Sequence, residues 1–324
     1  MKTSIKWLWG SAASLGLLAS LSIPARGGVI VDGTNSFAVG INSLGNLFDP
    51  IAGIGFVRLS DGYDPILPGA SREAWGVSAG GASGEADPQG LYGVTNIVAN
   101  GQPSFGSNAA VLRTALSTGA APLFQIEQDY GFVAGNVLRI ATTIVNVSGS
   151  DQSVLFSRQV AWEMGIGTTT FTYSVVPALS GSVVSATTGG TEDADPTVPF
   201  QNPVGPGGGV AGPDVLGGGF QLNLGTLVDR ASTSFAIYHA ISRVGQTRGD
   251  LLDEVSALGS AYTITGTSSE AGTIDSGSLS AALGFGPIVT ATATPEPPTL
   301  LLGLLGVSTG AAAVVAGRRR SKPA

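Results

Sequence analysis

The stretch that decides the fold is VLRIATTIVNV, residues 137–147. On an extended strand its side chains alternate between two faces, one with Leu138, Ile140, Thr142, Ile144 and Asn146 and the other with Arg139, Ala141, Thr143, Val145 and Val147. Both faces carry apolar groups, which is typical of a strand in a β-sandwich. Residues 148–152 (SGSDQ) read as a turn, and residues 153–164 return as a second strand, which predicts a hairpin.

Short runs of the same character recur along the chain, bounded by Gly, Asn, Asp and Ser. They are residues 37–41, 55–59, 91–99, 109–117, 123–129, 168–176, 182–187, 219–227, 233–242, 260–266 and 278–285. Lys, Glu, Arg and Met, which favour helices, are scarce. The sequence therefore predicts an all-β fold, an antiparallel β-sandwich with long loops rich in Gly and Pro, over residues 26–288.

Residues 189–219 (GGTEDADPTVPFQNPVGPGGGVAGPDVLGGG) interrupt this pattern. So much Gly and Pro predicts a segment without regular structure, either a linker between domains or a long excursion from one sandwich. The segments on both sides have similar composition, which favours the excursion. Residues 289–294 follow the sandwich as a short extended stalk.

Composition narrows the classes of function. With no cysteine and one histidine among 324 residues, a disulfide framework, a thiol nucleophile and a multi-histidine metal centre are excluded. Without the terminal basic residues and Glu296, nine basic residues face 21 acidic ones, a net charge of −12. These terminal residues are Lys2, Lys6, Arg318, Arg319, Arg320 and Lys322. We expect so acidic a domain to repel nucleic acid.

The first 25 residues have the three parts of a secretory signal peptide. Lys2 and Lys6 make a positive start, residues 7–21 are apolar, and small residues follow. Signal peptidase needs small side chains, so we expect cleavage after Ala25, with Gly27 as a second choice. The alternative is an uncleaved membrane anchor, for which the apolar run is short.

The other end of the chain carries a longer apolar run, residues 299–317, without a charged residue. As a helix it would be about 28 Å long, close to the roughly 30 Å of a bilayer core. The sequence thus predicts a single transmembrane helix. The basic residues Arg318, Arg319, Arg320 and Lys322 follow at once and would keep the C-terminus cytoplasmic, with the preceding domain outside.

Pro295, Glu296 and Pro297 stand just before this run. Pro-Glu-Pro, one apolar helix and a terminal arginine cluster resemble the PEP-CTERM sorting signal of Gram-negative bacteria over residues 295–322. The resemblance implies processing near Pro-Glu-Pro by an exosortase, a transient anchor in the inner membrane, and a final place at the cell surface or outside it. It also implies association with exopolysaccharide and biofilm material. The two prolines hold the segment extended, within reach of such an enzyme.

Two stretches in the middle, residues 61–76 and 138–164, are similar to segments of uncharacterised secreted bacterial β-sandwich proteins. That similarity implies a fold and no activity.

Residues 76–80 (GVSAG) match the G-x-S-x-G string of a hydrolase nucleophile, with His239 as the sole available base. The residues that follow, 81–88, cannot form the helix that such a site needs. His239 lies in FAIYHAIS, which reads as a buried strand. We therefore expect a glycine-rich turn and a structural histidine.

Acidic residues leave two further possibilities open. Glu73, Glu127, Asp129 and Glu163 are candidates for the carboxylate pair of a glycoside hydrolase, although no spacing singles out a pair. Close-set loop acids that a calcium ion would favour are Asp61 with Asp64, Asp193 with Asp195, and Asp250 with Asp253 and Glu254. None of these matches an EF-hand or a glycine-rich nonapeptide repeat, so we expect solvated loop charges and no cofactor.

Arg72, Glu73 and Trp75, near Pro68 and Gly69, suggest a sugar-binding patch, against the simpler alternative of a tryptophan that closes the core. Taken together, the sequence predicts a non-enzymatic structural or binding protein of the cell surface or matrix. The alternatives are a secreted carbohydrate-active hydrolase and a calcium-stabilised adhesin.

Overall fold

The computed structural model describes residues 26–66, 72–89, 92–119, 121–162, 170–177, 182–189, 192–201, 203–204, 207–211, 216–260, 262–269 and 279–291. Within these residues the strands form three sheets, and the paired strands are antiparallel. The largest sheet has the order β15 (Gly207–Ala211), β13 (Thr170–Pro177), β18 (Tyr262–Ser269), β19 (Leu279–Phe285), β17 (Ser232–Ile241), β11 (Val137–Asn146), β10 (Phe124–Ala134), β9 (Ala109–Leu116) and β7 (Ile97–Ala99), with β20 (Val289–Ala291) beside β17 and β8 (Ser104–Phe105) beside β9.

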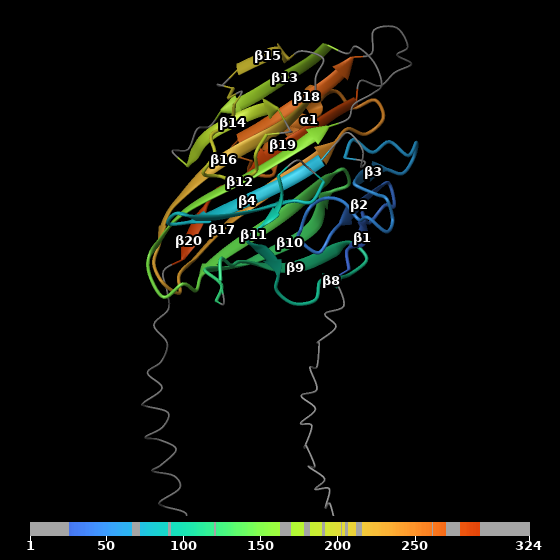
Figure 1. Ribbon diagram of the computed structural model, residues 1–324. Coiled ribbons are helices and arrows are strands. Elements are labelled where there is room, and N and C mark those ends of the chain that lie inside the picture. The colour runs from blue at the N-terminus through green and yellow to red at the C-terminus, as the bar shows by residue number, and fades with distance from the viewer. Residues whose placement is uncertain are drawn as a thin grey trace, which may run out of the picture.

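The second sheet is smaller, with the order β14 (Val183–Gly189), β16 (Leu216–Leu227), β12 (Gln152–Trp162), β4 (Arg72–Ala79), β5 (Ala82–Asp87) and β6 (Gly93–Thr95). The third consists of β1 (Gly28–Val31), β2 (Phe37–Ile41) and β3 (Phe56–Arg58). Strands of the two larger sheets run across the molecule in similar directions (Figure 1).

Aromatic side chains join the two larger sheets face to face. Phe156 of the small sheet meets Phe235 of the large sheet with ring centroids 4.9 Å apart, and Phe220 meets Phe285 at 5.7 Å. Phe56 of the third sheet reaches the same core through Phe132, at 5.9 Å. One continuous apolar cluster therefore lies between the layers, and the predicted all-β sandwich is confirmed.

Strand β11 has the alternation that the sequence predicts. Its buried face carries Leu138, Ile140, Thr142, Ile144 and Asn146. The predicted hairpin with the next strand is wrong, because β12 lies in the other sheet. Both edges of β11 are already taken, by β10 and β17, so the turn at residues 148–152 carries the chain across to the second layer instead.

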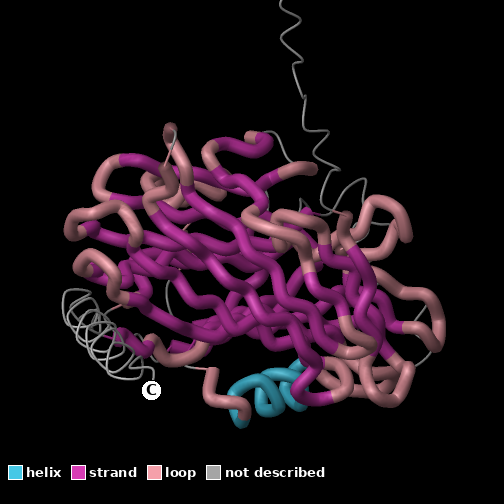
Figure 2. Tube along the Cα trace, turned by 90° about the horizontal axis from the view of Figure 1, so that it is seen from below, coloured by secondary structure: helices cyan, strands magenta, loops and turns pink. Residues whose placement is uncertain are grey.

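One helix, α1 (Arg248–Ala257), is present among the described residues and was not expected from the sequence. Thr247 caps its first turn: its hydroxyl oxygen accepts a hydrogen bond from the Asp250 amide, and the Asp250 carboxylate accepts one from the Thr247 amide, which together form a capping box. Leu251 and Val255 bury the helix against the outer face of the large sheet, next to Tyr238. Figure 2 shows the helix lying outside the layered strands.

Residues 192–201 and 203–204, the covering segment, lie over the outer face of the small sheet. Outward side chains of that sheet hold the backbone of this segment: Ser157 donates to the carbonyl of Ala194, and Gln221 donates to that of Val198. At Gly76 an added Cβ would lie 2.2 Å from the Ala194 carbonyl oxygen, so only glycine permits so close an approach. The expectation that residues 189–219 lack regular structure is wrong in part, because they contain β15 and the start of β16.

Candidate functional site

A buried group of polar side chains lies at the centre of the sandwich. Glu73 of β4 and Arg158 of β12 form an ion pair between Oε1 and Nε, on the inner face of the small sheet. Tyr130 of β10 and His239 of β17 face them from the large sheet. Exposed fractions are 2 % for Glu73, 0 % for Arg158 and 1 % for His239. We call these four residues the Arg158 cluster.

Burial dominates the ionisation of the Arg158 cluster. It raises the pKa of Glu73, an effect that the positive charge of Arg158 opposes. It lowers the pKa of His239 well below its ordinary value, and Arg158 lowers it further. Burial also raises the pKa of the Tyr130 phenol. His239 and Tyr130 therefore stay neutral at physiological pH.

The loop of residues 42–47 closes over the Arg158 cluster. Its Gly45 carbonyl oxygen accepts hydrogen bonds from Tyr130 Oη at 2.6 Å and from Arg158 Nη2 at 3.0 Å. The Leu47 amide donates to Glu73 Oε2 at 3.0 Å. Gly45 has φ +85°, and a Cβ there would lie 2.0 Å from Gln128 Oε1. The ion pair thus fixes the path of this loop.

Several polar atoms beside the Arg158 cluster have no hydrogen-bond partner among the described residues. They are Gln128 Nε2, Thr142 Oγ1, Arg158 Nη1 and both ring nitrogens of His239. Buried polar atoms of this kind are satisfied by interior water or by a bound polar molecule. Because the four cluster residues are all but fully buried, they cannot act on a ligand in solution without an opening of the loop.

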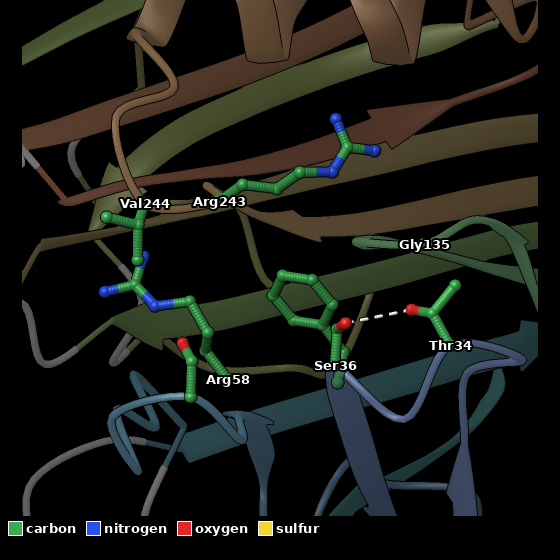
Figure 3. Close-up of a pocket in the computed structure, with 8 residues that line it drawn as sticks. Thr34, Ser36, Arg58, Gly135, Arg243 and Val244 are labelled. Carbon is green, nitrogen blue, oxygen red and sulfur yellow. Dashed lines mark hydrogen bonds between the residues drawn. The ribbon is translucent and has the colours of Figure 1, made fainter.

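An accessible pocket lies where the third sheet meets the end of β17 (Figure 3). Its volume is about 460 Å³. Its lining combines three hydroxyl residues, two arginines, two apolar residues and a glycine: Thr34, Ser36, Ser60, Arg58, Arg243, Phe37, Val244 and Gly135. We call it the two-arginine pocket.

The turn between β1 and β2 places the hydroxyl groups of this pocket. Asp32 accepts hydrogen bonds from the backbone amides of Ser36 and Phe37, at 2.6 and 2.7 Å, and from Thr34. Burial raises the pKa of Asp32, but these hydrogen bonds outweigh it and the pKa is lowered, so the carboxylate remains charged. Thr34 Oγ1 then donates to Ser36 Oγ at 2.9 Å, as Figure 3 shows.

Each arginine of the pocket is already bound to a carboxylate. Arg58 donates from Nε and Nη2 to Asp61, at 3.0 and 2.5 Å, and from Nη1 to the Ser242 carbonyl oxygen. Hydrogen bonding to Arg58 lowers the pKa of Asp61. Arg243 donates from Nη2 to Glu254 of α1 at 2.7 Å. Arg58 is buried and held, whereas the Arg243 side chain remains about half exposed, 47 %.

A row of acidic side chains lies under the covering segment, on the outer face of β5. Ser83 donates to Asp195 at 2.5 Å, and the next outward residue, Glu85, meets Asp193. Burial raises the pKa of Glu85 to about 8, with further contributions from Asp193, Asp87 and Asp195. Glu85 is 6 % exposed and carries a proton at neutral pH.

The carboxylates suggested for a glycoside hydrolase are separated by the fold. Glu73 is locked in the Arg158 cluster between the sheets. Glu127 and Asp129 lie two residues apart on the outward face of β10, where Glu127 pairs with Arg113 at 2.7 Å. Glu163 lies outside the described residues. The fold therefore leaves Glu127 and Asp129 as the one neighbouring pair among the described candidates.

The serine hydrolase alternative fails on geometry. Residues 76–79 belong to β4, and the chain turns at Gly80 and Gly81 into another strand, β5, rather than into a helix. Ser78 lies opposite Ser83 on the outer face of the small sheet, where Ser83 bonds Asp195, whereas His239 is buried between the sheets. The prediction that His239 lies in a buried strand is confirmed.

The loop acids suggested for calcium have other partners. Asp61 binds Arg58, Asp64 accepts from the amides of residues 55, 56 and 66, and Asp250 caps α1. Among the described residues no three His, Asp or Glu side chains are grouped so as to hold a metal ion.

Trp75 closes the core and does not form a sugar-binding patch. Its ring is fully buried, stacks on Phe156 with centroids 6.2 Å apart, and donates from Nε1 to the Leu44 carbonyl oxygen. Its neighbour Glu73 is buried as well. Pro68, Gly69 and the Arg72 side chain lie outside the described part of the chain.

The sorting residues predicted from the sequence lie outside the described residues. They are Ala25, Pro295, Glu296, Pro297, Arg318, Arg319, Arg320 and Lys322, together with the apolar run 299–317. In the described part of the chain, no helix has the length and hydropathy to cross a membrane.

The two-arginine pocket was not found from the sequence. Arg58 and Arg243 are 185 positions apart, and neither stands in a recognisable motif. A partial signal was present in Asp32-Gly-Thr-Asn-Ser, a polar turn between two short apolar runs, which predicts a side-chain-stabilised turn but not what it faces.

No family model and no curated protein matches the chain. Among solved structures, the chain is similar to a galactose mutarotase-like protein from Lactobacillus casei. The match has a TM-score of 0.37 at 14 % identity and covers 82 % of this chain and 96 % of the other. A similarity this low assigns no activity to the chain.

Proposed function

We propose that this chain is a protein of the bacterial cell surface or extracellular matrix that binds polysaccharide without cleaving it. Signal peptidase would release it after Ala25, and an exosortase would process it near Pro295, Glu296 and Pro297. The apolar run 299–317 and the following basic residues would anchor it in the inner membrane until that step. The lasting product is the sandwich domain.

The observation that carries the binding role is the chemistry of the two-arginine pocket. Thr34, Ser36 and Ser60 bring hydroxyl groups, and Arg243 brings a guanidinium with Nε and Nη1 beyond its bond to Glu254. Val244 brings exposed apolar surface to the same opening. Sugars present hydroxyl groups and apolar C–H faces, which such a lining complements. None of the described residues that line the pocket is acidic, whereas the glycosidases that use carboxyl groups need a pair of them at the bond they cleave.

Binding is tested by a glycan array probed with the purified chain from residue 26 to residue 291. The proposal expects selective binding of polysaccharide fragments, lost on Arg243→Ala and retained on Arg113→Ala. The two arginines each pair with one glutamate at 2.7 Å, but Arg113 lies on the outer face of the large sheet. An array without any specific glycan would refute the binding role.

Sorting is tested separately by mass spectrometry of the protein recovered from cells with and without the exosortase. The proposal expects a chain that ends near Pro295 in the first strain and an intact C-terminus in the second. An intact C-terminus in both strains would refute exosortase processing.

The alternative, a secreted carbohydrate-active hydrolase, is favoured by one observation. Burial and the charge of Glu127 raise the pKa of Asp129, while Glu127 itself is ion-paired. A carboxyl group with a raised pKa beside a second carboxyl group is the pattern of an acid and its partner. The pair lies on an outward sheet face, and we therefore expect no activity. Release of reducing ends from a polysaccharide, abolished by Asp129→Asn, would establish the alternative.

A further inference from the structure

The charges around the two-arginine pocket bear on which sugars it accepts. The charge of Arg58 is neutralised by Asp61, to which it makes three hydrogen-bond contacts. The charge of Arg243 is neutralised by Glu254. Asp32 lies behind the hydroxyl turn and keeps its charge. Two positive and three negative groups therefore give the pocket and its immediate partners a net charge of −1.

The surrounding domain adds to this balance. Between the two terminal segments, nine basic residues face 21 acidic ones. A carboxylate that entered the pocket would lose water, compete with Asp61 and Glu254 for the guanidinium groups, and meet the field of an acidic domain. An uncharged sugar loses water at a smaller cost than a carboxylate does. It also avoids the competition and the field, since its hydroxyl groups can hydrogen-bond to an arginine that is already paired.

We infer that the two-arginine pocket selects uncharged sugar units and rejects their acidic counterparts. The inference rests on the proposed function and names the substrate class of the same site. Arg243 acts here as an oriented hydrogen-bond donor, and Asp61 and Glu254 suppress the attraction of the two arginines for anions. Like-charge repulsion of this kind sets specificity more strongly than it sets affinity.

The chain offers a matched pair of variants for the test. Glu254→Gln removes the carboxylate that holds Arg243, and Asp253→Asn removes an exposed carboxylate one position earlier on α1. Both variants change the net charge by the same amount. Only the first frees the guanidinium of Arg243.

The experiment measures Kd at low salt for neutral oligosaccharides and for the same oligosaccharides carboxylated at C6. We expect the wild-type chain to bind the carboxylated form at least about 10-fold more weakly, a difference of about 1.4 kcal/mol. Glu254→Gln should lower the ratio of the two Kd values, carboxylated over neutral, at least about threefold. Asp253→Asn should leave this ratio nearly unchanged. Thermal unfolding of both variants confirms that they fold.

Two results overturn the inference while leaving the proposed function standing. One is equal or tighter binding of the carboxylated sugars, with an affinity that falls as salt is added. The other is an equal response of both variants, because this would assign the effect to net charge rather than to Arg243. Binding of no sugar at all would overturn the proposed function together with the inference.

Discussion

The Arg158 cluster and the two-arginine pocket use the same chemical unit, an arginine bound to a carboxylate, in opposite surroundings. Arg158 and Glu73 are buried between the sheets, whereas Arg243 and Glu254 stand at an opening. In the interior each partner has lost its water, so both charges depend on one another and on the loop of residues 42–47. At the opening, water screens the pair and leaves donors for a ligand. Burial therefore decides whether the pair determines architecture or recognition.

The largest expected effect is the loss of the buried pair. Glu73→Gln leaves Arg158 charged and uncompensated in the core, which should lower the free energy of unfolding by about 3–5 kcal/mol. Urea denaturation measures this change in the free energy of unfolding. The matched change at an exposed pair, Glu127→Gln opposite Arg113, should cost less than about 1 kcal/mol. Similar losses in the two variants would contradict the distinction between interior and surface pairs.

The next largest effect concerns the loop over the Arg158 cluster. Gly45→Ala places a Cβ 2.0 Å from Gln128 Oε1 at φ +85°, so the free energy of unfolding should fall by about 3 kcal/mol. Gly53→Ala is the control, because Gly53 also has positive φ, +66°, but nothing lies within 4 Å of the added Cβ. The control should lose about 1 kcal/mol. A cost at Gly45 no greater than at Gly53 would show that the loop is not tightly packed there.

A third effect, of intermediate size, depends on pH and concerns Glu85. Its pKa is about 8 in the folded chain against 4.5 unfolded, so between these values the folded chain holds a proton that the unfolded chain has lost. The contribution of protonated Glu85 to the free energy of unfolding is therefore fully present below about pH 4.5 and is lost as the pH rises through about 8.

The matching variant is Glu85→Gln, whose amide can donate to Asp193 at any pH. We expect it to raise the free energy of unfolding by about 2 kcal/mol at pH 9 and to change little at pH 5. Thermal unfolding at several pH values measures the difference. If the stability of Glu85→Gln had the same pH profile as the wild type, Glu85 would not be the source of the pH dependence.

The smallest effect on stability is expected at the pocket. Arg243→Ala breaks an exposed pair and should lower the free energy of unfolding by less than about 1 kcal/mol. Calorimetric melting would show a shift of a few degrees at most. A loss comparable to that of Glu73→Gln would mean that Arg243 is part of the architecture.

The strands were largely predictable, because most are short runs of β-branched and apolar residues bounded by Gly, Asn, Asp and Ser. Strands β4 and β5 were not predicted, because glycine and serine residues in them weaken the strand pattern. The glycine at position 76 is needed there, since the covering segment passes close to it. The α1 helix was missed although Thr247 and Asp250 form a capping signal, because its ten residues are short and weakly amphipathic. The crossing between β11 and β12 depends on which strand edges are free, and no local pattern shows that.

The candidate sites were less predictable than the strands. Acidic pairs were visible in the sequence, but their partners were not: Asp61 binds an arginine three residues away, and Asp193 meets Glu85 from a strand more than a hundred residues earlier. The Arg158 cluster and the two-arginine pocket both join residues that are far apart in the sequence. Only the fold brings such residues together.

The most direct test of the account compares glycan binding by Arg243→Ala and Arg113→Ala, using the glycan that the wild-type chain binds best. Both variants remove one exposed, glutamate-paired arginine, so charge and stability change alike. We expect at least about a 10-fold rise in Kd for Arg243→Ala and no measurable change for Arg113→Ala. Equal affinities for the two variants would contradict the assignment of recognition to the two-arginine pocket.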